Sequence, residues 1–368
     1  MATKFGIWNA YKDCNLNYPN FGNVTDCIET GLLWVGSVFS IFSIIGSLFI
    51  IWTFCVYEDQ RTRARLFLLF IAICDFFTAV GYAIALIWSL FNKDFSICVN
   101  NKSHVVLSAC IIESGIDMYF PVCSFFWTVV LGFHIFFLFI GKAYFKKKVV
   151  FVCILVAGWG LPLLNTLVAF FLNVLGPGPP TSNAGWCFIN YNIYDNNTKN
   201  DKLHWVFEFT FAKMWDLSAM IIVIIMYTIV FIRLCVQKCR SVEKSFSGPD
   251  FKLIFIPLVF FILRIWGDSR WLIETIPQDD NFEYSQTCKY PSGKVLAYLQ
   301  VIGDPGQGWA NAILYILLTE AIRKRIFSSF KKYFKRVCCC FVRKSTPSSQ
   351  ENETDMLVNE KANRLSYY

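Results

Sequence analysis

The sequence predicts an all-α membrane protein: a bundle of seven transmembrane helices, followed by an amphipathic eighth helix beside the membrane. The composition supports this class because 55% of the residues are hydrophobic and only 16% are charged, less charge than a soluble domain of this length carries. Apolar stretches of about 20 residues or more, enough to cross a bilayer, recur along the 368 residues. Lys and Arg gather in short clusters between these stretches, as they do in the loops of membrane proteins.

The seven spans differ in how much charge they contain. The first four, which carry few charged residues, cover residues 30–57, 66–91, 105–141 and 149–171. Spans five to seven, at residues 203–232, 252–275 and 293–319, contain several charged residues each. Because charges inside a bilayer are costly, we expect these side chains to face protein or water rather than lipid.

The distribution of basic residues predicts the orientation in the plasma membrane. The loops after spans one, three and five, and the segment after span seven, are rich in Lys and Arg, whereas the opposite loops have few. Since the basic side of a membrane protein is cytoplasmic, we expect an extracellular N-terminus and a cytoplasmic C-terminus. N-glycosylation triplets at Asn23, Asn101 and Asn196 all fall in segments assigned to the outside.

The organisation outside the bundle follows from composition. Residues 1–29 form the extracellular N-terminus, residues 30–319 the seven-helix domain, and residues 320–340 an amphipathic helix that ends in three cysteines. Cysteines directly behind a basic amphipathic helix are typical palmitoylation sites, which predicts acylation of Cys338, Cys339 and Cys340. The polar segment 341–368 is predicted to be a disordered cytoplasmic tail, and its Ser and Thr residues suit phosphorylation and arrestin binding.

Charged residues within the spans are candidates for a ligand pocket or a polar switch. They are Glu113, Asp117, Lys213, Asp216, Arg264, Asp268 and Asp304. Glu113 and Asp117 are four residues apart and share a helix face, and Lys213 and Asp216 are spaced to pair with each other. Arg264 lies roughly 18 Å into span six, where it needs an acid from Asp268, Asp216 or Asp304. A switch that rearranges and a static ion pair both remain open.

Asp75 is the one acid of span two, midway along an apolar run. Such a residue either binds sodium or joins a polar core, in which Asn311 of span seven is the candidate partner. Both alternatives remain open.

Short motifs fall in the expected spans: Gly158-Trp159-Gly160-Leu161-Pro162, Gly185-Trp186-Cys187, Ile256-Pro257-Leu258, Arg264-Ile265-Trp266 and Gln307-Gly308. In this order and placement they resemble the secretin-like and cyclic-AMP-receptor-like branch of G-protein-coupled receptors. Within that branch the chain is similar to the family of the orphan G-protein-coupled receptor 157. The resemblance covers residues 61–327, nearly the whole membrane domain.

The resemblance implies a receptor that couples an unknown extracellular ligand to a heterotrimeric G protein. In such receptors the inner end of helix six moves outward, which implies that Pro257 permits a bend. Gly306, Gln307 and Gly308 are the corresponding flexible positions in span seven. The resemblance also implies a disulfide between Cys110 and Cys187; the pairing of Cys14, Cys27, Cys98 and Cys288 remains open. The short N-terminus places ligand recognition in the helices and outer loops.

Other functions are less consistent with the sequence. A transporter or channel is the main alternative, although no internal repeat relates the two halves. An enzyme is not expected, because the three histidines are scattered, show no metal-ligand spacing and predict neither a metal nor another cofactor. The net charge of +8 arises from clusters beside the spans, which predicts contact with membrane lipids rather than with nucleic acid.

Overall fold

The computed structural model describes residues 30–91, 104–140, 147–177, 186–190, 206–239, 255–275 and 291–328. The glycosylation triplets, the three candidate palmitoylation cysteines, the cysteines with open pairing and the polar tail all lie outside these residues.

Six of the seven predicted spans are observed as helices close to their expected bounds. The first four are α1 (Thr30–Val56), α2 (Arg63–Phe91), α3 (His104–Phe139) and α4 (Lys148–Phe171), with a short 3-10 turn η3 (Glu58–Gln60) between α1 and α2. In the fifth span a π-helical turn, η6 (Phe209–Lys213), continues into α6 (Met214–Cys239). The sixth span is α7 (Phe255–Thr275).

The seventh span is two helices, where the sequence predicted one. Helix α9 (Pro291–Gly303) and helix α10 (Gln307–Leu318) are separated by a turn at residues 304–306. Pro305 explains the break, because proline lacks an N–H and its ring clashes with the carbonyl of the preceding turn. The chain tightens there: the N–H of Gly306 donates to the carbonyl oxygen of Gly303 at 3.1 Å. The predicted span over residues 293–319 is therefore interrupted at residues 304–306, directly before and at the predicted bend positions Gly306, Gln307 and Gly308.

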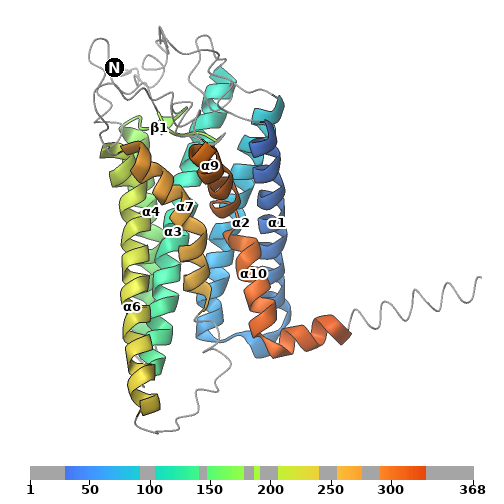
Figure 1. Cartoon of the computed structure of the whole chain (residues 1–368), viewed down its shortest axis with the longest axis vertical. Coiled ribbons are helices and arrows are strands. Elements are labelled where there is room, and N and C mark those ends of the chain that lie inside the picture. Colours follow the sequence, from blue (N-terminus) through green and yellow to red (C-terminus); the bar gives the residue numbers. More distant parts are fainter. Residues whose placement is uncertain are drawn as a thin grey trace, which may run out of the picture. The chain divides into compact units, whose positions relative to one another are not determined.

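The helices pack into a closed bundle (Figure 1). Helix α3 contacts α2, α4, α6 and α7, and so runs through the middle of the bundle. Helix α1 packs against α2, α9 and α10, while α7 packs against α6, α9 and α10. A two-stranded antiparallel hairpin of β1 (Leu175–Gly176) and β2 (Phe188–Ile189) lies at one end, hereafter the hairpin end.

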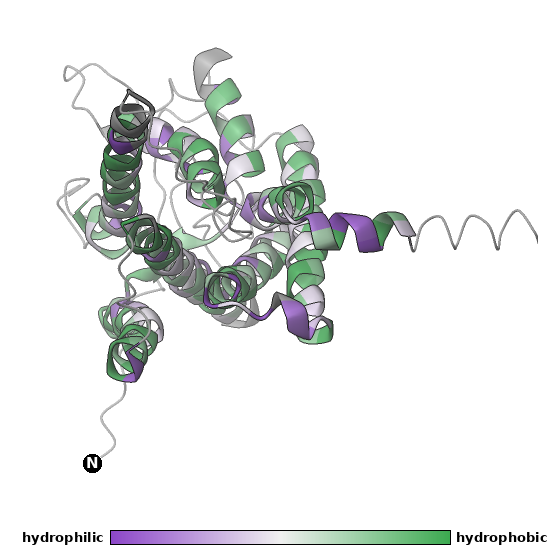
Figure 2. Ribbon diagram, turned by 90° about the horizontal axis from the view of Figure 1, so that it is seen from below, coloured by the Kyte–Doolittle hydropathy of each residue, from purple (hydrophilic) through white to green (hydrophobic). Residues whose placement is uncertain are grey.

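Hydropathy alone identifies fewer membrane spans than the fold contains. Among the described residues, five helices are long and apolar enough to cross a membrane. Helix α7 carries Arg264, Asp268 and Arg270, and the two halves of the seventh span are short. Apolar residues dominate most of the helical ribbon of the bundle in the end-on view (Figure 2). The bundle is therefore completed by packing of helices α7, α9 and α10, which hydropathy alone does not single out.

Two glycines bring α1 and α10 into backbone contact. A Cβ atom at Gly46 would lie 2.8 Å from the carbonyl oxygen of Gly308, and one at Gly308 would lie 2.5 Å from Ser43 Oγ. The N–H of Gly308 donates to the same Ser43 hydroxyl at 2.9 Å. Small residues at a helix contact allow this approach. Gly308, predicted as a bend position, thus also packs tightly against α1.

A separate unit begins at Thr319. Residues 320–328 are helical, and Lys324 Nζ pairs with Glu320 Oε1 one turn before it at 2.7 Å. Both side chains of this pair are exposed. The remainder of the predicted amphipathic helix lies outside the described residues.

We predict that Gly308→Ala lowers the free energy of unfolding by about 1–3 kcal/mol, because the added methyl group would overlap the hydroxyls of Ser43 and Ser47. Gly160 in α4 is the matched control, since a Cβ atom there meets no atom within 4 Å. Gly160→Ala should leave stability unchanged or raise it by up to about 1 kcal/mol through helix propensity. Thermal denaturation in detergent compares the two, and equal Tm values would contradict the close contact.

Candidate functional site

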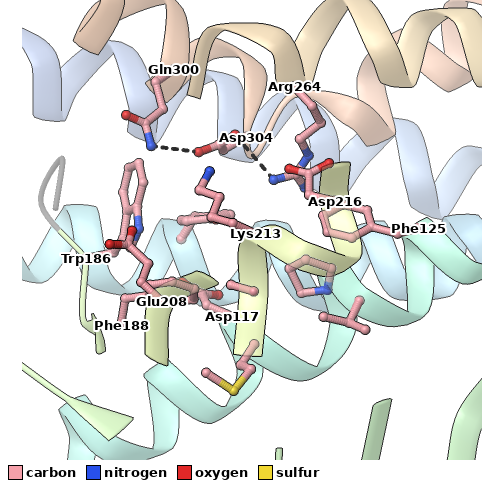
Figure 3. Close-up of a pocket in the computed structure, with 15 residues that line it drawn as sticks. Asp117, Phe125, Trp186, Phe188, Glu208, Lys213, Asp216, Arg264, Gln300 and Asp304 are labelled. Carbon is pink, nitrogen blue, oxygen red and sulfur yellow. Dashed lines mark hydrogen bonds and ion pairs between the residues drawn. The ribbon is translucent and has the colours of Figure 1, made fainter. Parts of the chain in front are cut away.

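A cavity lies inside the bundle (Figure 3). Its walls come from α2, α3, the fifth span, α7, α9 and the hairpin segment. The charged residues that line it are Asp117, Glu208, Lys213, Asp216, Arg264 and Asp304. The aromatic residues that line it are Tyr82, Phe125, Trp186 and Phe188.

The structure therefore brings together five of the predicted residues, from four different spans: Asp117, Lys213, Asp216, Arg264 and Asp304. Glu113 and Asp268 do not line the cavity. Glu113 instead binds the backbone of Cys187, which lies between the lining residues Trp186 and Phe188. Asp268 pairs with the lining residue Lys213.

The hairpin is fastened to α3 by three contacts. Cys110 and Cys187 form a disulfide with a Cα–Cα distance of 5.5 Å. Glu113 Oε2 accepts a hydrogen bond from the N–H of Cys187 at 2.9 Å, and Ser114 Oγ donates to the carbonyl oxygen of Gly176 at 3.4 Å. The aromatic residues on either side of Cys187 in this short segment are thereby held in the cavity wall. Glu113 positions the hairpin and does not face the cavity.

Arg264 pairs with Asp304, one of the three acids considered for it. Arg264 Nη1 lies 3.2 Å from Asp304 Oδ1, and both residues are buried. Gln300 Nε2 donates to the other oxygen of Asp304 at 3.0 Å, and Arg270 Nη1 donates to Gln300 Oε1 at 2.9 Å. The guanidinium carbon of Arg264 also lies 4.9 Å from the centre of the Phe125 ring, a cation–π contact. This cluster joins α7 to α9 and to α3 (Figure 3).

Lys213 pairs across the bundle, contrary to the sequence prediction. Its Nζ lies 2.7 Å from Asp268 Oδ1 on α7, whereas Asp216 on its own helix is not its partner. The prediction assumed α-helical spacing between Lys213 and Asp216. Lys213 is instead the last residue of the π-helical turn η6, whose wider turn changes the direction of side chains relative to the α-helix that follows.

A second polar cluster joins α2, α3 and α10. Asp75 accepts two hydrogen bonds, from Ser124 Oγ at 2.8 Å and from Asn311 Nδ2 at 2.9 Å. Gln307 Nε2 donates to Ser124 Oγ at 3.0 Å. Of the two alternatives for Asp75, the structure shows the polar core with Asn311. Both oxygens of its carboxylate already have donors.

Sequence reasoning missed several members of these clusters. Gln300 precedes Asp304 by one helical turn, so the four-residue spacing could have identified it. Ser124 and Glu208 were visible as polar residues in apolar spans but were not assigned to the site. Trp186 and Phe188 flank a predicted disulfide cysteine, yet nothing in the sequence shows that they reach the cavity.

Pro257 lies in the first turn of α7 as described. Proline is tolerated in a first turn because its missing N–H would be unpaired there anyway. The chain before Phe255 lies outside the described residues, so the bend at Pro257 remains a prediction.

Comparison with known proteins gives consistent matches. The profile of the seven-transmembrane receptors of the secretin family matches residues 29–259. The chain is 26% identical to mouse (Mus musculus) G-protein coupled receptor 157 over 335 residues, covering 86% of this chain and 89% of that protein. It is 21% identical to Cyclic AMP receptor-like protein A of Dictyostelium discoideum over 324 residues, covering 87% and 73%.

A crystal structure of squid rhodopsin superposes with a TM-score of 0.59, at 14% identity and covering 93% of each chain. At this identity the likeness concerns the fold alone.

We predict that Lys213→Met lowers the free energy of unfolding by about 3–5 kcal/mol, because it leaves Asp268 as an uncompensated buried acid. Adding Asp268→Leu should restore most of this loss, since removal of both charges also removes the cost of burying them. Thermal denaturation of the purified variants in detergent checks both. A double variant as unstable as the single one would show that the ion pair is not the interaction lost.

Proposed function

Because the chain belongs to the secretin family of seven-transmembrane receptors, we propose that it transmits an extracellular signal to a heterotrimeric G protein. It is a multi-pass membrane receptor and not an enzyme. The observation that supports signalling best is the buried Arg264–Asp304 pair, which joins two helices at the wall of the internal cavity. A molecule that enters the cavity can therefore act directly on a contact between helices.

In this proposal the hairpin end faces the outside of the cell. Basic residues support this orientation: Arg61 lies between α1 and α2, Arg63 begins α2, and Lys147 and Lys148 lie at the start of α4, all at the end opposite the hairpin. The same orientation places glycans on Asn23, Asn101 and Asn196, and puts the palmitoylated Cys338–Cys340 segment and the arrestin-binding tail in the cytoplasm at the plasma membrane.

Activation begins at the two ion pairs of α7. Lys213 of the fifth span and Asp304 of the seventh span both hold α7, through Asp268 and Arg264, which lie one turn apart on the same face of that helix. A ligand group that competes for one of these charges weakens the attachment of α7 to its neighbours. The opposite end of α7, with Pro257, then moves outward and opens a site for the G protein between the ends of the helices.

The cluster around Asp75 carries the change toward the cytoplasmic end. Gln307 begins α10 directly after the turn that contains Asp304, and it donates to Ser124 of α3. Gln307 follows Asp304 by only three residues, so a shift of Asp304 also moves Gln307 and changes the hydrogen bond that joins α10 to α3. Asn311 extends this connection to α2 through Asp75.

A transporter or channel is the second candidate. The break at residues 304–306 favours it, because transporters use interrupted helices at the membrane midplane to bind their substrates. Flux of solutes through liposomes that contain the purified chain distinguishes this candidate from a receptor.

We predict that Asp304→Asn raises basal guanine-nucleotide exchange on the coupled G protein, because it leaves Arg264 without its acid and destabilises the resting state. Each 1.4 kcal/mol lost from the resting state increases the active fraction about tenfold while that fraction is small. Exchange is measured in membranes against a panel of G proteins, with surface expression measured in parallel.

The charge-reversed double variant, Arg264→Asp with Asp304→Arg, is the matched control. It keeps an ion pair between α7 and α9 and should return basal exchange toward that of the unmodified chain. No exchange with any G protein, together with solute flux in liposomes, would replace the receptor proposal by the transporter.

A further inference from the structure

We propose that the cavity binds an organic amine, a ligand with a cationic nitrogen on an apolar or aromatic body, and that Asp117 is the acid that pairs with this nitrogen. The inference rests on the proposed receptor function and adds the chemical class of its ligand.

Asp117 is a buried acid that lacks a basic partner. It lines the cavity and is 3% exposed, its carboxyl group interacts with that of Glu113 one helical turn before it, and neither of its oxygens accepts a hydrogen bond from a basic or neutral donor in the described part of the chain. Asp75 is buried to a similar extent, yet both its oxygens accept hydrogen bonds. Burying an ionised carboxylate without compensation is strongly unfavourable. A cation supplied by a ligand would compensate it.

The charges around the cavity favour a cation over an anion. Four acids and two bases line it. Both bases already have acids, since Arg264 pairs with Asp304 and Lys213 pairs with Asp268. Among the described residues, the remaining lining acids Asp117, Glu208 and Asp216 form no ion pair within 4.0 Å, so the cavity has more acids than bases to pair with them. An anionic ligand would have to break an existing pair to find a base.

The uncharged part of the lining fits an organic cation rather than a metal ion. Tyr82, Trp186 and Phe188 contribute aromatic surface, and Met118 and Val122 contribute apolar surface from α3. Aromatic faces attract alkylammonium groups and also bury an apolar ligand body. Among the described residues, no group of three or more His, Cys, Asp or Glu side chains is placed to hold a metal ion.

The position of Asp117 relates amine binding to the ion pairs of α7. Asp117 lies on the α3 side of the cavity, and Arg264 and Asp304 lie on the side of α7 and α9 (Figure 3). Gly81 of α2 packs closely against Asp117 Oδ1, so α2 leaves room for the carboxylate but offers no side chain to pair with it. An amine held at Asp117 therefore directs the rest of its body across the cavity toward α7.

The experiment measures binding to the purified full-length chain in detergent at neutral pH, where simple amines are protonated. The probes are phenethylamine and tryptamine, each compared with the alcohol of the same skeleton and with phenylacetate. We expect the amines to raise Tm at lower concentrations than the alcohols, and phenylacetate to have no effect, because ligands that bind only the folded state stabilise it.

The variant Asp117→Asn should reduce the apparent affinity for the amines about 30-fold or more and leave the effect of the alcohols unchanged. Asp117→Glu, which keeps the charge, should retain part of the amine effect. Without a probe, Asp117→Asn should have a Tm equal to or above that of the unmodified chain, since it removes an unpartnered buried charge. That result would show that the variant folds.

Two results would overturn the proposal: amines that stabilise the unmodified chain no better than their alcohols, or an amine effect that persists in Asp117→Asn. The latter is expected if Asp117 is neutral because it shares a proton with Glu113. The receptor function is tested separately: amine binding without nucleotide exchange on any G protein would contradict the receptor function and not the amine proposal. Raised basal exchange in Asp304→Asn without amine binding would instead support the receptor function and overturn only the proposal that the ligand is an amine.

Discussion

Arg264 imposes the constraint on which the rest of the structure depends. It lies midway along α7, and a guanidinium at that depth cannot face hydrocarbon. Its need for an acid holds α7 beside α9 through Asp304, and its contact with Phe125 brings the same charge against α3. Three helices are thereby joined around one charge.

A buried ion pair stabilises a fold only weakly, because desolvation offsets much of the Coulomb attraction. Its stronger effect is to specify one arrangement, since losing either partner leaves an isolated charge in a dry interior. The second pair, between Lys213 and Asp268, imposes the same condition on α7 from the side of the fifth span. Helix α7 is thus held by charges that a ligand in the adjoining cavity can reach, which is a physical basis for coupling binding to helix movement.

The sequence predicted the number of spans, their approximate bounds and most of the charged residues of the cavity. Long uncharged runs and the cost of intramembrane charge were sufficient for this, and Asp117, Asp216, Arg264 and Asp304 were found in that way. The pairing of charges was harder. Arg264 had three candidate acids, and Lys213 was assigned to the wrong one because a π-helical turn leaves no periodic signal in the sequence. The inward placement of Trp186 and Phe188 depends on tertiary contacts that spacing along the chain does not contain.

The distance between the ends of the helices opposite the hairpin tests the central claim most directly. Spin labels at Phe255 of α7 and Val56 of α1, both exposed, would report this distance by double electron–electron resonance. We expect one dominant distance in the unmodified chain, and in Asp304→Asn a second, longer distance that disappears in the charge-reversed double variant. An unchanged distance distribution in Asp304→Asn would contradict the claim that the Arg264–Asp304 pair holds α7 in its resting position.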